Sequence, residues 1–89
     1  IDMAYSASGL SRLAGSSNMN LWSYVTTDAI ATINSAGYFN SAANMLAVRD
    51  VIIVADTNTP TTNFVTVLSN TGTVVDVSDG TAIAETDGD

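Results

Sequence analysis

The pattern of apolar and polar positions changes at about residue 20. Before that point a few apolar residues, Leu10, Leu13 and Met19, stand among Ser, Ala, Gly and Asn. Neither a helical spacing nor a strand alternation persists, because glycines and short polar residues interrupt both. We therefore predict an extended N-terminal arm over residues 1–20. It becomes ordered against another surface or remains an ordinary chain terminus. A single small β domain follows over residues 21–89.

The alternation becomes regular in residues 21–27, which are rich in aromatic and β-branched side chains. The period of two places Trp22, Tyr24 and Thr26 on one face of a predicted strand. The next segment, residues 29–34, fits both a short helix and a strand. We predict a strand or irregular structure there.

An uninterrupted apolar run within residues 50–56 predicts a central strand that is buried on both faces. Alternating segments at 63–69 and 73–78 predict two further strands, and residues 81–85 can add a short edge strand. The turn between the first two of these strands contains Gly72, which supplies the positive φ that a tight reversal needs.

Between the predicted strands lies the region of greatest helical character. Asn40 can cap a short helix over residues 41–46. We expect the neighbouring Tyr38 and Phe39 to be core residues, with a partner-binding role as the alternative.

Short strands with turns every 7–12 residues are typical of all-β domains. The predicted fold is mainly β: a small antiparallel β-barrel or β-sandwich with one short helix and an extended N-terminal arm.

The composition removes the side chains that most often perform chemistry near neutral pH. The chain has no His, Cys or Lys, so it lacks the imidazole base, the thiolate and the amine nucleophile. A two-carboxylate hydrolase remains formally open, but most of the carboxylates fall at predicted strand ends and turns, where Asp is common for backbone reasons. We predict a non-enzymatic protein without a cofactor.

The charge limits the partners. Nine carboxylates against two arginines give a formal net charge of −7. Nucleic acid and anionic membrane surfaces would repel such a chain, so we expect neither as a partner. The longest apolar run is five residues, Val51–Ala55, far short of a membrane span, and no secretion signal is visible.

Two binding alternatives remain. A carbohydrate-binding module would use exposed aromatic side chains, for which Trp22 and Tyr24 are the candidates. A weak calcium ion between subunits could use oxygen ligands near the C-terminus, although no EF-hand pattern is present. The candidate ligands are Asp76, Ser78, Asp79, Glu85, Asp87 and Asp89.

The middle of the chain resembles small virion proteins of tailed bacteriophages. The segment from Ser35 to Leu46 reads SAGYFNSAANML, and VRDVIIV follows from Val48. The opening MAYSASGL from Met3 is similar to the openings of such proteins. Many members have Gly-Asp where this chain has Arg49-Asp50. The group includes head decoration (cement) proteins and modules of head or tail fibres, and the resemblance implies a small β-rich fold, a structural role and symmetric assembly.

Our leading hypothesis from the sequence is a capsid decoration protein on the outer surface of a phage head, where it bridges major capsid proteins. We also expect self-association, as a trimer or another symmetric oligomer. The alternative is a receptor- or glycan-binding module of a phage head or tail fibre. Six apolar residues of the arm and the start of the first strand are the expected partner contacts: Tyr5, Leu10, Leu13, Met19, Leu21 and Trp22.

Overall fold

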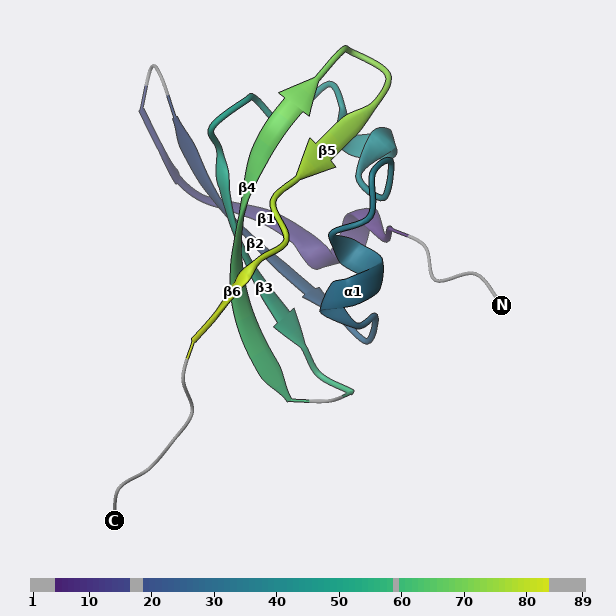
Figure 1. Cartoon of the computed structure of the whole chain (residues 1–89). Coiled ribbons are helices and arrows are strands. Elements are labelled where there is room, and N and C mark those ends of the chain that lie inside the picture. The colour runs from purple at the N-terminus through teal and green to yellow at the C-terminus, as the bar shows by residue number, and fades with distance from the viewer. Residues whose placement is uncertain (1–4, 17–18, 59, 84–89) are drawn as a thin grey trace.

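One mixed sheet organises the chain in the computed structural model, which describes residues 5–16, 19–58 and 60–83 (Figure 1). The strand order is β1-β2-β3-β4-β5, and β6 pairs with the other end of the β4 edge that β5 occupies. The elements, in chain order, are the 3₁₀ turn η1 (Ala7–Gly9), β1 (Leu10–Gly15), β2 (Asn20–Thr26), α1 (Ile30–Ile33), the 3₁₀ turn η2 (Asn40–Ala42), β3 (Val51–Asp56), β4 (Thr61–Asn70), β5 (Val75–Val77) and β6 (Thr81–Ala82).

The mainly β fold with one short α-helix is confirmed. The sheet does not close into a barrel, so the sandwich-like alternative holds. The expectation of purely antiparallel pairing is wrong, because β2 and β3 run parallel with Leu21 beside Val51. A parallel pair needs a long crossover, and residues 27–50 supply it, carrying α1 and η2 across one side of the sheet (Figure 1).

The crossover corrects two predictions of local structure. Residues 30–33 form α1 rather than a strand, because Ile33 is fully buried against the sheet from within the crossover. The helix predicted over 41–46 is reduced to η2 and a following turn closed by Leu46 N–H donating to Ala42 O. The Asn40 side chain does not cap this turn. Its Oδ1 accepts a hydrogen bond from Val75 N–H at 2.9 Å, which ties the crossover to β5.

The predicted boundary at residue 20 is also wrong over the described part of the segment. Residues 10–15 form β1, which pairs antiparallel with β2 through Leu10 beside Tyr24 and Gly15 beside Asn20. An irregularity in the register between Arg12 and Ala14 explains why no alternation is visible in the sequence. The strand is therefore defined by its pairing with β2 rather than by its own pattern.

The core lies between the sheet and the crossover. Trp22 and Tyr24 lie on the same face of β2, as predicted, and that face points into the core, where they are 7% and 0% exposed. Val75 and Val77 also point inward, and the turn before them has Gly72 at φ +95°, as the predicted tight reversal requires. The buried apolar side chains are Leu10, Trp22, Tyr24, Ile33, Phe39, Ala42, Leu46, Ile52, Val54, Val65, Val67, Val75 and Val77.

Candidate docking surface

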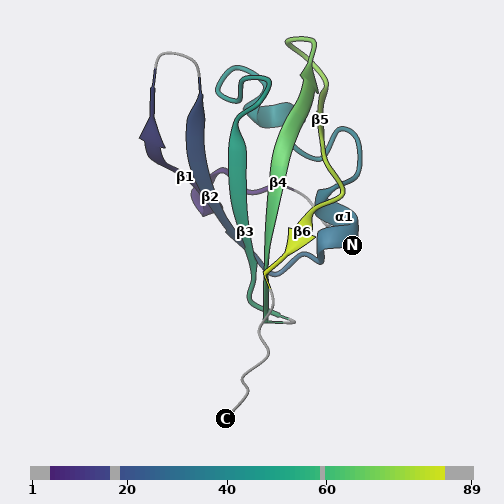
Figure 2. The same ribbon diagram turned by 60° about the vertical axis from the view of Figure 1, so that its left-hand side comes forward.

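One side of the strands β2, β3 and β4 faces away from the crossover (Figure 2). Alternation along each strand turns every second residue to this side, and the pairing brings Ile53 beside Ser23 and Phe64. We call this the outer face. Its members are Leu21, Ser23, Val25, Val51, Ile53, Ala55, Thr62, Phe64, Thr66 and Leu68.

The outer face is uncovered within the part of the chain that the structure describes. Val25, Phe64 and Leu68 are 52%, 41% and 54% exposed. The prediction that residues 50–56 are buried on both faces is therefore only half right, because Val51 and Ile53 are half-buried. No member of the outer face is charged. A contiguous apolar surface of this kind usually marks an interaction site.

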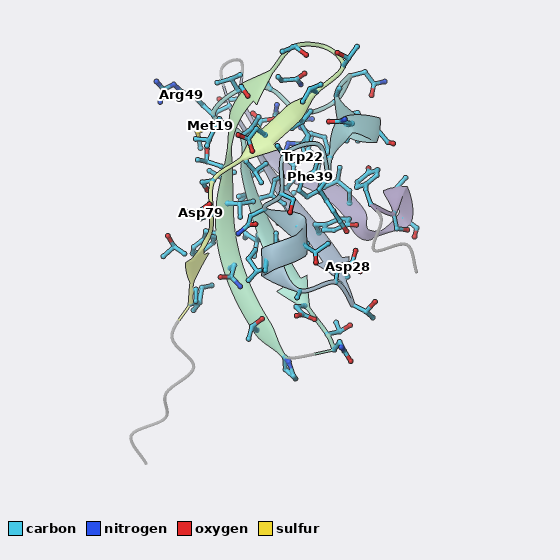
Figure 3. The ribbon with its side chains drawn as sticks, turned by 45° about the vertical axis from the view of Figure 1, so that its right-hand side comes forward. Met19, Trp22, Asp28, Phe39, Arg49 and Asp79 are labelled. Carbon is cyan, nitrogen blue, oxygen red and sulfur yellow. The ribbon has the colours of Figure 1, made fainter. Side chains whose placement is uncertain are left out.

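The hairpin of β1 and β2 adds a second exposed apolar surface at one end of the sheet. Leu13 and Met19 are 55% and 47% exposed. Met19 lies across the sheet from Trp22 and Phe39 (Figure 3). Arg12 Nε donates to Asn20 Oδ1 at 3.0 Å and braces the two strands. A shallow groove at this end is lined by Ala14, Gly15, Ser16, Met19, Asn20 and Leu21.

The structure separates the six predicted contact residues into two groups. Leu10 and Trp22 belong to the buried core and Tyr5 packs against it, so these three stabilise the fold. Leu13 and Met19 are exposed on the hairpin, and Leu21 is half-buried on the outer face. The sequence did not point to Val25, Phe64 or Leu68 as surface positions, although the alternation of their strands could have done so.

Four aromatic rings hold the N-terminal segment onto the sheet. Tyr5 stacks on Tyr24 with ring centroids 5.6 Å apart, and Phe39 lies edge-on to Tyr24 at 5.2 Å. Tyr38 completes the cluster, 5.0 Å from Phe39. The prediction that Phe39 is a core residue is confirmed, since it is 1% exposed. Because Trp22 and Tyr24 are both buried, neither can serve as a sugar-stacking platform.

A chain of hydrogen bonds crosses the same region. Ser6 N–H donates to Tyr24 Oη at 2.9 Å, the Tyr24 and Tyr38 hydroxyls are 2.8 Å apart, and Tyr38 donates to Asp28 Oδ2 at 2.6 Å. Burial raises the pKa of Tyr38 far above its ordinary value, and the hydrogen bonds to Asp28 and Tyr24 raise it further. The phenol therefore stays protonated and acts as a structural donor.

Asp50 is the most buried charged group in the described part of the chain, at 0% exposure. Oδ1 accepts from Asn20 N–H at 3.0 Å, while Oδ2 accepts from Trp22 Nε1 at 2.9 Å and from Ala47 N–H at 3.0 Å. Burial acts to raise the pKa of Asp50, but these hydrogen bonds outweigh it and hold the pKa below its usual value. Its lone pairs are occupied by β2 and the crossover, so Asp50 is an anchor and not a free catalytic carboxylate.

The lowered pKa of Asp50 predicts acid sensitivity. The unfolded chain takes up the proton near the ordinary value of 3.8 and the folded chain only at lower pH. The stabilisation is therefore complete above about pH 5 and is lost as the pH falls through 3.8 toward the folded pKa. Urea unfolding at pH 7, 5, 4 and 3 should show a larger loss of stability in the wild type than in Asp50→Asn. Parallel curves for the two proteins would contradict this assignment.

Within residues 5–16, 19–58 and 60–83 no three carboxylates lie close enough to hold a metal ion. Asp76 and Asp79 are described, whereas Glu85, Asp87 and Asp89 lie outside the described residues. No helix in the described part is long and apolar enough to cross a membrane.

No protein-family model, curated protein or solved structure matches this chain.

Proposed function

We propose that this chain is a non-enzymatic structural protein of a tailed-phage virion, which decorates the outer surface of the head and stabilises contacts between major capsid proteins. The observation that carries the proposal is the β1–β2 hairpin. It presents Leu13 and Met19 to solvent at one end of the sheet, next to a shallow groove. The resemblance of residues 35–54 to small virion proteins supports the same role.

The hairpin suits docking onto a preformed lattice. β1 is an edge strand that pairs only with β2 among the described elements, so its second edge is available to extend a neighbouring sheet. Leu13 and Met19 would bury apolar surface beside that edge. A protein that binds only the assembled lattice stabilises it by mass action, and many copies multiply the effect.

The described side chains also support a binding role over catalysis. Asp50 has its oxygens committed to three strong hydrogen bonds, and Tyr38 is held protonated. Burial of Trp22 and Tyr24 argues against the glycan-binding alternative, which needs exposed rings. The exposed apolar side chains lie on the outer face and on the hairpin, and burying them against a partner favours noncovalent assembly.

The proposal predicts that Leu13→Ser combined with Met19→Ser weakens binding to undecorated heads of the encoding phage by about 30-fold, because two half-exposed apolar side chains lose their burial at the contact. Co-sedimentation with heads made without this protein gives the affinity. Point substitutions are preferable to deleting residues 1–20, because that deletion removes β1 and Leu10 from the fold.

The matched control is Val74→Ser combined with Ile83→Ser, which changes two apolar residues of comparable exposure, 45% and 40%, next to β5 and β6 at the edge of the sheet opposite β1. We expect the control to bind heads like the wild type. Equal binding by the hairpin variant would reject the hairpin as the contact. Failure of the wild type to bind heads, with binding to fibres or cell-surface glycans instead, would favour the receptor-binding alternative.

A further inference from the structure

We propose that the outer face of the sheet binds a second copy of this chain, giving a homodimer in which two sheets pack face to face. The face is apolar across β2, β3 and β4, and no described segment covers it. Val25 and Phe64 project from it with 52% and 41% of their surface exposed. This pairing does not depend on the proposed capsid contact, which uses Leu13 and Met19 of the hairpin, although Leu21 borders both surfaces.

Charge favours a second copy over a charged partner. The chain carries a net charge of −7, but the outward positions of β2, β3 and β4 are apolar or hydroxyl-bearing. Asp50 and Asp56 are buried on the opposite side, and Asp28 and Asp79 lie in loops beyond the strands. Asp76 lies on β5, at the rim of the face. Two acidic copies can therefore meet through this face with their described carboxylates at the periphery, where solvent screens them.

The size of the face fits a small interface. Its residues lie on three strands, and β2 and β3 are only seven and six residues long, so the region that all three strands share is about 20 Å long and about 15 Å wide. That gives on the order of 300 Å² in projection, within the range of the largest apolar patch of a monomer, about 300–600 Å². Corrugated side chains expose more area than their projection, but the face remains smaller than the roughly 800 Å² per partner of a standard interface, so the dimer belongs to the weaker class.

Sheet packing defines the expected geometry. Two sheets stack about 10 Å apart with their strands about 30° from parallel, and their inward side chains interdigitate. A twofold axis makes each copy contribute the same patch. Ile53 lies at the centre of that patch, between Ser23 and Phe64, so its counterpart in the partner should lie close to the axis.

The test compares Val25→Lys with Val74→Lys by light scattering and sedimentation equilibrium on the purified protein. Both positions are exposed valines, at 52% and 45%, but only Val25 lies on the outer face. The wild type and Val74→Lys should have twice the chain mass of 9.2 kDa. Val25→Lys should weaken the dimer at least about 30-fold, because two valines that the interface would bury are replaced by two lysines of like charge. Near-ultraviolet circular dichroism of the buried Trp22 checks that each variant is folded.

Phe64→Lys is the second variant on the face, and it should dissociate the dimer in the same way. A wild type that is monomeric at millimolar concentration, or trimeric, overturns the proposal. So does a dimer that survives both Val25→Lys and Phe64→Lys. If the wild type is a monomer and Val25→Lys abolishes its binding to heads, a capsid protein binds this face instead of a second copy. If the wild type is a dimer that does not bind heads, this inference stands and the proposed function is rejected.

Discussion

Replacing Asp50 with alanine should lower the free energy of unfolding by about 4 kcal/mol. The substitution leaves Asn20 N–H, Trp22 Nε1 and Ala47 N–H without their acceptor inside the fold. Each unsatisfied buried donor costs roughly 1–3 kcal/mol. Since small domains are stable by only about 5–15 kcal/mol, the variant should be close to unfolding at 37 °C. Urea denaturation followed by Trp22 fluorescence measures the change.

Asp50→Asn refines this prediction. All three strong partners are donors, so the amide NH₂ must face an N–H group wherever it is placed. With its oxygen at the position that accepts from Trp22 and Ala47, the variant loses the Asn20 bond and should cost about 2 kcal/mol. Asp79→Ala, at an exposed position in the loop between β5 and β6, is the control and should cost less than about 0.5 kcal/mol. An Asp50→Ala protein as stable as this control would contradict the anchoring role.

Phe39→Ala should cost about 3–5 kcal/mol, because it opens a cavity at the centre of the aromatic cluster. The ring is 1% exposed and contacts the rings of Tyr5, Tyr24 and Tyr38. Loss of this ring should also release the N-terminal segment, since Tyr5 would lose a partner. Thermal unfolding gives the stability change, and amide exchange at Ser6, whose N–H donates to Tyr24, reports the release.

Phe64→Ala provides the matched comparison, because the same substitution is made at a ring that is 41% exposed. Both changes are best measured with Val25→Lys also present, which removes the proposed face-to-face pairing from the comparison. Phe64→Ala should then cost about 1 kcal/mol or less. Equal losses of unfolding free energy at the two positions would show that Phe39 is not the centre of the aromatic cluster.

Local patterns predicted the second half of the fold well. The strands expected at 63–69 and 73–78 contain most of β4 and all of β5, because alternation and the Gly72 turn act over short distances. The segment at 21–27 became β2, with Trp22 and Tyr24 on one face as expected. That face is buried, although Trp22 was also expected to contact a partner.

Features that depend on distant contacts were missed. β1 has few apolar residues and an irregular register, so only its pairing with β2 makes it a strand. The parallel pairing of β2 and β3 follows from the crossover and from Asp50, which links both strands, and no local pattern reports it. Arg49 adopts a φ of +82° immediately before β3. That is a conformation that glycine prefers over other residues.

The contact residues expected from the sequence differ in their burial. The apolar character of Leu13 and Met19 marked them as contact residues, and they are exposed, so their contact role stays a prediction. Leu10 and Trp22 have the same character, but the antiparallel pairing of β1 with β2 turns them into the core. Sequence alone could not separate the two groups, because a residue that contacts a partner and one that fills a core are chemically alike.

The most direct test of the proposed function is an electron cryomicroscopy reconstruction of the phage virion that we propose carries this protein. We predict copies at symmetric positions on the outer surface of the head, each with the β1–β2 hairpin and its Leu13 and Met19 side chains against a major capsid protein. Copies found only on fibres or inside the head, or copies whose hairpins point into solvent, would contradict the account.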